Sequence, residues 1–294
     1  MTMKKFIVAS IAVFLVLILL FVGSALIARS LFRGDGSGIT GTSGVGLIEV
    51  KGMIIDSREP VRQLRHFLKD DDIKAVVLRI DSPGGVVAPS QEIYEEVRKF
   101  AAKKKIIVSM GSLAASGGYY IAAPASMIFA NPGTITASIG VIIKLSNIET
   151  LMDKIGIKST VIKTGKYKDS GSPVRDLTEE DRAMFQSVID STHNQFVKAV
   201  AVGRKLPVEE IRKIADGRIL SGEQALALKL VDRLGTLQDA VDEAGKLAGI
   251  QGDPEIILPP KKKVNYLDFL SEGAEERFDS AVGKVGRGLQ LLYQ

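Results

Sequence analysis

Residues 109–126 read SMGSLAASGGYYIAAPAS and place Ser116 among small residues, between Ala115 and Gly117. An apolar run typical of a strand, residues 106–110, precedes the turn, and an apolar run typical of a helix, residues 119–123, follows it. Ser116 would therefore sit where a strand passes into a helix, with backbone N–H groups and a helix N-terminus beside its hydroxyl. A nucleophile and the oxyanion it generates need that setting, so the stretch predicts a serine hydrolase.

Composition restricts the classes of protein to which the chain can belong. It has 294 residues, 46% of them hydrophobic and 25% charged, which indicates a globular protein with a sizeable core. The chain has no cysteine, which excludes disulfides and thiolate catalysis, and only two histidines, which argues against a histidine-built metal centre. The net charge of +5 is mild, and the lysine clusters at 103–105 and 261–263 lack interleaved aromatics. We therefore expect no nucleic-acid partner, no metal and no cofactor.

Residues 6–28 form an uncharged, apolar run near the N-terminus. As a helix the run would be about 34 Å long, enough to cross a hydrocarbon core of about 30 Å. A cleaved signal peptide is the alternative, but its apolar region is usually only about 7–15 residues long. Two lysines in residues 1–5 favour a cytoplasmic N-terminus, against Arg29 and Arg33 on the other side. We expect a single-pass anchor in the cell (inner) membrane, with the rest of the chain extracytoplasmic.

The remaining sequence divides into a linker, one domain and an extension. Residues 29–44 are rich in glycine and predict a flexible linker. Residues 45–250 alternate strand and helix patterns and predict an α/β domain, while 251–294 form a C-terminal extension whose charged tail, from Lys261 onward, fits a solvated or partner-packing helix. The predicted strands are 45–54, 74–80, 106–110, 127–130, 134–143 and 159–165, and the longer predicted helices are 58–70, 90–102 and one from a capping box at Thr178 to about Gly203.

A serine nucleophile needs a base, and histidine is the usual one. His66 and His193 both lie in helix-like segments that we expect to be exposed, away from turns and strand ends. A lysine whose pKa is lowered by burial is the alternative base. The loop KTGKYKDSGSP, residues 163–173, offers Lys166 and Lys168, and spacing alone does not separate the two because residues two apart face the same side of an extended chain.

The sequence DSPGG, residues 81–85, closes an apolar strand and opens a helix. Paired glycines let the backbone approach a ligand closely and direct N–H groups at developing negative charge. A tight strand-to-helix turn and a phosphate cradle would use the same residues. The glycine clusters of the chain do not have the spacing of dinucleotide-binding or P-loop motifs.

With these motifs in one order, residues 45–250 resemble the signal peptide peptidase A family, in its short bacterial form. The resemblance rests on DSPGG (81–85), SMGSLAASGGYYIA (109–122), TASIGV (136–141), GKYKDSGSP (165–173) and ADGRILSGEQALALKLVDRLG (215–235). It implies a serine–lysine peptidase with a crotonase-like α/β fold of repeated β-β-α units, a fold that the family shares with the proteolytic subunit of the Clp protease.

The resemblance also implies roles for five residues. Ser116 would be the nucleophile, Lys168 the general base and Ser138 the residue that orients this lysine. Gly85, with Gly117 as a possible second donor, would hold the oxyanion. A free lysine has a pKa near 10.4, so fewer than about one in a thousand would be neutral at pH 7. Apolar surroundings and a hydroxyl partner favour the neutral amine that a base requires.

Family substrates are remnant signal peptides, so the resemblance implies apolar peptides as substrates. It further implies a homo-oligomeric ring in which neighbouring subunits contribute the serine and the lysine to each site. Two other functions stay open: a non-catalytic, ring-forming scaffold, and an acyl-CoA enzyme of the crotonase type. The retained Ser116, Lys168 and Ser138 oppose the scaffold. The membrane tether and the lack of a carboxylate at an obvious base position oppose the acyl-CoA enzyme. A peptidase of the same fold with another client stays open as well.

Overall fold

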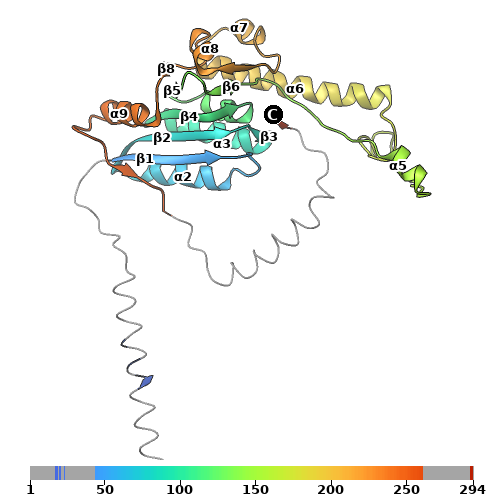
Figure 1. The fold of residues 1–294 in the computed structure, drawn as a ribbon, viewed down its shortest axis with the longest axis horizontal. Coiled ribbons are helices and arrows are strands. Elements are labelled where there is room, and N and C mark those ends of the chain that lie inside the picture. The colour runs from blue at the N-terminus through green and yellow to red at the C-terminus, as the bar shows by residue number, and fades with distance from the viewer. Residues whose placement is uncertain (1–16, 19, 21–22, 24–43, 261–291, 294) are drawn as a thin grey trace, which may run out of the picture. The chain divides into compact units, whose positions relative to one another are not determined.

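The computed structural model describes residues 17–18, 20, 23, 44–260 and 292–293, and Figure 1 shows their arrangement. Most of the predicted anchor at 6–28, nearly all of the linker and the predicted tail helix beyond residue 260 lie outside the described residues. Within the described part, no helix has the length and apolar character needed to cross a membrane.

Strands and helices alternate along the described domain, as the sequence predicts. The strands are β1 (Gly44–Lys51), β2 (Ile73–Ser82), β3 (Gly85–Val86), β4 (Lys105–Ala115), β5 (Met127–Ala130), β6 (Ile135–Ala137), β7 (Ile219–Ser221), β8 (Arg233–Leu234), β9 (Ile256–Ile257) and β10 (Leu292–Tyr293). The helices are α2 (Arg58–Lys69), α3 (Val87–Ala101), α4 (Gly117–Ala122), α5 (Glu149–Lys154), α6 (Glu179–Arg204), α7 (Val208–Arg212), α8 (Gly222–Ala227) and α9 (Leu237–Leu247).

The main sheet is mostly parallel, which confirms a mixed α/β fold. Its strand order is β7-β6-β4-β2-β1-β9, and β5 pairs with both β4 and β8. The long strand β4 pairs with β5 along its first half and with β6 along its second half. Only β6 and β7 pair antiparallel in this sheet, among the described residues. Strand β4 therefore ends between β2 and β6, with the residues that follow it at the carboxyl edge of the sheet.

Both faces of the sheet are buried, which explains why its strands read as continuous apolar runs. Along β2, Val76, Leu78 and Ile80 point into the larger core, while Ala75 and Val77 point into a smaller one. Residues of α2, α3, α4 and α6 contribute to the larger core, and α9 covers the smaller one. The strands are thus held from both sides, and the β4–α4 turn is built on a rigid base.

Helix α6 extends beyond the sheet and carries the short helix α5 and its loops beside its N-terminal end (Figure 1). With 26 residues, α6 spans about 39 Å. The predicted capping box is confirmed: Thr178 accepts from the N–H of Asp181, and the Asp181 carboxylate accepts from the N–H of Thr178. The C-terminal half of α6 packs on the core through Phe196, Val197 and Val200.

Three predicted strands differ from the structure. The strand predicted at 106–110 is β4, which continues through the small residues as far as Ala115. Residues 159–165 form no strand, so that prediction is wrong; Ile162 is 98% exposed and no described strand pairs with the segment. β-Branched residues form a strand only where a neighbouring strand or a core receives them. The strand predicted at 134–143 is limited to β6, because Ala137 and Ser138 adopt φ values of 63° and 52°, which end the extended backbone.

Two short strands extend the fold beyond residue 250. Strand β9 pairs in parallel with β1 at the edge of the main sheet. Strand β10 pairs antiparallel with β3, with Tyr293 opposite Gly85 and Leu292 opposite Val86. The edge of β3 therefore accepts an extended segment as an added strand.

Candidate active site

Ser116 occupies the junction between β4 and α4 in a strained conformation. Its φ of 51° and ψ of −117° are rare for a residue with a side chain. The backbone is held on both sides, since its N–H donates to the Ala137 carbonyl at 2.7 Å and its carbonyl accepts from the Tyr120 N–H at 2.8 Å. The side chain is fully buried, and its Oγ has no hydrogen-bond partner among the residues that the structure describes. A strained, buried hydroxyl without a partner costs stability, which is typical of a functional group.

Glycines surround Ser116 because the backbones around it lie in close contact. A Cβ on Gly117 would lie 2.7 Å from Ser90 Oγ and 3.1 Å from the Gly85 nitrogen. A Cβ on Gly85 would lie only 2.1 Å from the carbonyl oxygen of Ile54. The structure thus brings Gly85 and Gly117, the two predicted oxyanion donors, side by side next to Ser116.

Ser138 follows the neighbouring strand at the corresponding position. In the β4–β6 pair, Ala115 lies opposite Ala137, so Ser116 and Ser138 are the next residues of two adjacent parallel strands. The Ser138 side chain is 7% exposed, and its Oγ donates to the Gly217 carbonyl at 3.3 Å. The register therefore brings the second predicted serine beside the first.

Lys168 lies away from these residues within one chain. It is exposed, and the loop that carries it is tied to Asp181 in the first turn of α6. Helix α6 packs against α4 at Phe196, whose ring lies 4.9 Å from the ring of Tyr120. The helix between Asp181 and Phe196 is about 22 Å long, far beyond the reach of a lysine side chain. The structure does not bring Lys168 to Ser116 of the same chain.

The three lysines of this loop differ in their contacts. Lys163 Nζ donates to the Asp169 carboxylate and, at 3.0 Å, to the Lys166 carbonyl. Lys166 Nζ lies 3.7 Å from Glu180 Oε1. Lys168 makes no hydrogen bond or ion pair with any residue that the structure describes. Of the two lysines that sequence spacing leaves equivalent, Lys168 is the one whose ammonium is not engaged.

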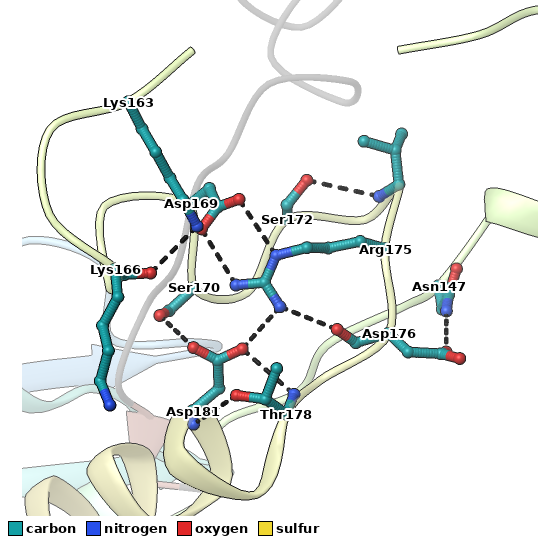
Figure 2. A network of polar contacts seen from close by, with 11 residues as sticks. Asn147, Lys163, Lys166, Asp169, Ser170, Ser172, Arg175, Asp176, Thr178 and Asp181 are labelled. Carbon is teal, nitrogen blue, oxygen red and sulfur yellow. Dashed lines mark hydrogen bonds and ion pairs between the residues drawn. The ribbon is translucent and has the colours of Figure 1, made fainter. Parts of the chain in front are cut away.

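A network of charges follows Lys168 in the chain and includes Asp169, Arg175 and Asp181 (Figure 2). The guanidinium of Arg175 and the ammonium of Lys163 lower the pKa of Asp169 from 3.8 to about 2. Arg175 and the Ser170 hydroxyl lower the pKa of Asp181 well below its usual range. Sequence patterns missed this network, because no repeat or period relates residues of an irregular loop.

Neither histidine forms a hydrogen bond with the Ser116 hydroxyl, which has no partner within the described part of the chain. His66 is exposed on α2, as predicted. The predicted exposure of His193 is wrong: this residue of α6 is half-buried, and its Nε2 is buried with no hydrogen-bond partner in residues 44–260. It lines a cavity together with Gly140, which follows β6, and Gly217, which precedes β7.

Comparison with known proteins assigns the chain to a family. Residues 98–251 match the family model described as peptidase family S49. The chain belongs to this family. A Synechocystis protein named as a protease is 45% identical over 227 residues, which cover 76% of this chain and 82% of the relative. An Enterococcus faecium protein named for signal peptide peptidase SppA is 40% identical over 63% of this chain and 54% of its own length. The chloroplastic serine protease SPPA of Arabidopsis thaliana is 32% identical over a stretch that covers 72% of this chain and 32% of the relative.

Membership of family S49 makes the chain a serine peptidase and confirms the resemblance seen in its motifs. The matched residues 98–251 include Ser116, Ser138 and Lys168. The described part of the chain contains no group of three or more histidine and acidic side chains that could hold a metal ion.

Proposed function

We propose that the chain is a membrane-anchored serine endopeptidase in which Ser116 is the nucleophile and Lys168 the general base, acting on apolar peptides such as remnant signal peptides. The observation that carries the proposal is the state of Ser116, a strained and fully buried residue whose hydroxyl has no hydrogen-bond partner among the described residues. The adjacent backbones of Gly85 and Gly117 support it, because a serine nucleophile requires N–H donors for the oxyanion.

The chemistry follows from these residues. The neutral amine of Lys168 takes the proton of Ser116 Oγ as this oxygen bonds to the peptide carbonyl carbon. The N–H groups of Gly85 and Gly117 stabilise the tetrahedral oxyanion. The C–N bond then breaks, and the Lys168 ammonium donates its proton to the leaving amine. A water molecule, deprotonated by Lys168, attacks the ester, and the proton returns to Ser116 Oγ as the acyl group leaves. Ser138 orients the lysine.

We infer that the lysine at each Ser116 comes from a second copy of the chain. The distance along α6 between the lysine loop and α4 supports this. The segment that leads to the loop also exposes apolar side chains, which are typical of a protein interface. They are Ile148, Leu151, Ile155, Ile157, Val161 and Ile162. A second copy docked there would lie next to Lys168, and repetition of this head-to-tail contact closes a ring.

The edge of β3 supports a peptide as the substrate. Strand β10 pairs antiparallel with this edge, at Gly85 and Val86. A peptide that takes the place of β10 on this edge would form main-chain hydrogen bonds beside Ser116 and present its carbonyl to the oxyanion donors. The apolar run at 6–28 would hold the domain extracytoplasmically at the cell membrane, where apolar peptides remain after preprotein processing. The name of the Enterococcus relative supports the signal peptide as client.

Labelling with a fluorophosphonate probe and cleavage of an apolar reporter peptide test the dyad in the full chain. We expect Ser116→Ala to abolish labelling, and Ser116→Ala and Lys168→Ala each to reduce cleavage by at least about 10³-fold. The matched controls are Ser112→Ala, an exposed serine on the same strand, and Lys166→Ala; both keep activity.

Three results would contradict the proposal. Labelling that persists in Ser116→Ala removes this residue as the nucleophile. An unlabelled wild type indicates a non-catalytic scaffold or an acyl-CoA enzyme. An active Lys168→Ala variant beside an inactive Lys166→Ala variant moves the base to Lys166.

A further inference from the structure

Arg175 lies at the centre of the network that follows Lys168 (Figure 2). Its Nε and Nη2 donate to the two oxygens of Asp169 at 3.1 and 3.0 Å. Its Nη1 donates to Asp181 Oδ2 at 2.6 Å and to the Asp176 carbonyl at 2.8 Å. One planar guanidinium thus joins the residue next to Lys168 with the first turn of α6. A bidentate arrangement of this kind fixes orientation as well as distance.

A second contact joins the same two segments. Ser170, two residues after Lys168, donates from its Oγ to Asp181 Oδ1. Asp169 accepts in addition from Lys163 on the other side of the loop. The two residues that follow the lysine are therefore both held, one through Arg175 and one through Ser170.

The anchor of these contacts belongs to a rigid element. The Asp181 side chain is 3% exposed, and its carboxylate and N–H complete the capping box with Thr178. Helix α6 continues from this turn into the core. The lysine loop has little packing of its own, since residues 161–168 are all exposed. Polar contacts therefore replace a core in determining where the loop lies.

We propose that Arg175 is the positioning residue for Lys168: it locks the backbone that follows the lysine to the first turn of α6, so that the ammonium projects from a fixed point. The inference rests on the proposed role of Lys168 as general base. A displacement of about 1 Å in a catalytic group can cost about 10²-fold in rate. Arg175 would therefore affect the rate through the position of Lys168, although it touches no reacting atom.

The test compares kcat, KM and their pH dependence for Arg175→Gln in the full chain. We expect kcat at pH 7 to fall by about 10- to 100-fold, with KM changed by less than about twofold. A loosely held lysine is more hydrated, and hydration favours the ammonium over the neutral amine that the reaction requires. The acidic limb of the kcat/KM profile should therefore shift to higher pH, and the variant should recover part of its activity there. Arg175→Lys keeps the positive charge but loses the planar, bidentate donors of the guanidinium. We expect it to recover less than half of the rate that Arg175→Gln loses.

The matched control is Arg204→Gln, at the opposite end of α6. Arg204 Nη2 donates to Asp232 Oδ1 at 2.6 Å, so this variant also loses an arginine–aspartate pair of the helix. We expect the acidic limb of its kcat/KM profile to lie at the same pH as in the wild type, even if the variant is less stable to unfolding. If Arg175→Gln does not fold, Asp169→Asn takes its place, because it preserves side-chain size and weakens the same contact.

Two outcomes separate this inference from the proposed function. An inactive Lys168→Ala variant beside an Arg175→Gln variant with the wild-type rate and pH limb overturns the positioning role alone. An active Lys168→Ala variant overturns both. A loss of activity in Arg175→Gln without any shift of the acidic limb also contradicts the positioning role, because a general loss of stability would produce it.

Discussion

Single residues around Ser116 combine features that are unfavourable for stability and useful for catalysis. A positive φ at a serine and a buried hydroxyl without a partner both cost free energy. They persist because the surrounding structure fixes the conformation of Ser116. The residue lies between the end of β4 and the start of α4, and its backbone forms hydrogen bonds with Ala137 and Tyr120. Glycine at 85 and 117 lets the backbones lie close together beside Ser116. A Cβ at Gly85 would clash with the backbone of Ile54, and a Cβ at Gly117 would lie 3.1 Å from the Gly85 nitrogen.

Gly85→Ala tests this packing at the scale of one methyl group. The new Cβ would lie 2.1 Å from the Ile54 carbonyl oxygen, so the β3 backbone has to move and its N–H moves with it. Loss of one oxyanion donor costs about 10²- to 10³-fold in kcat, and we expect a loss of that size from steady-state kinetics. Gly133→Ala is the control, because a Cβ there meets no atom within 4 Å. Wild-type kcat in a folded Gly85→Ala protein would exclude Gly85 from the oxyanion site.

At the scale of elements, α6 links two regions with different kinds of stabilisation. Its C-terminal half is held by apolar packing, with Phe196 and Val200 fully buried. Its N-terminal turn is held by the charges of Arg175, Asp169 and Asp181. Such charge-based contacts depend on pH, whereas apolar packing does not.

Acid should release the N-terminal turn of α6 only at low pH. The folded-state pKa of Asp169, about 2, lies below its unfolded value of 3.8, and the pKa of Asp181 is lowered too. A carboxylate with a lowered pKa stabilises the fold fully above its unfolded pKa and loses that contribution as pH falls to the folded value. The difference in unfolding free energy between wild type and Arg175→Gln, from urea unfolding in detergent, should stay constant down to about pH 4 and shrink towards pH 2. A difference already absent at pH 5 would contradict this.

At the scale of the whole molecule, the two predicted members of the dyad belong to separate regions. Ser116 directly follows β4 of the sheet, whereas the loop that carries Lys168 is tied to Asp181 in the first turn of α6 and follows an exposed apolar segment. Figure 1 shows that α6 extends away from the sheet towards this loop. Under the proposed mechanism, a single chain therefore has the nucleophile without its base. The head-to-tail assembly that we propose would supply the base to every nucleophile and cover the apolar side chains.

Mixing of two inactive variants tests the shared site. Full chains carrying Ser116→Ala and Lys168→Ala are dissociated, combined in equal amounts and reassembled, with two affinity tags to verify mixed assemblies. If each site takes its serine from one subunit and its lysine from the next, random assembly restores about a quarter of the wild-type activity. The matched control combines Lys168→Ala with the Ser116→Ala/Lys168→Ala double variant and stays inactive. Mixed assemblies without recovered activity would show that both residues act within one chain.

The sequence by itself determined what depends on neighbouring residues along the chain. The strand at 127–130, the cap of α6 and the strand-to-helix turn at Ser116 are all predicted, because apolar period, capping chemistry and small residues act locally. The strand expected at 159–165 is absent, because strands need a partner that local sequence does not supply. Only the tertiary structure decided that Gly85 lies beside Gly117, that Arg175 joins Asp169 to Asp181, and that Lys168 lies far from Ser116. Those relations depend on how sheet and helices pack, since packing sets the distances between segments remote in sequence.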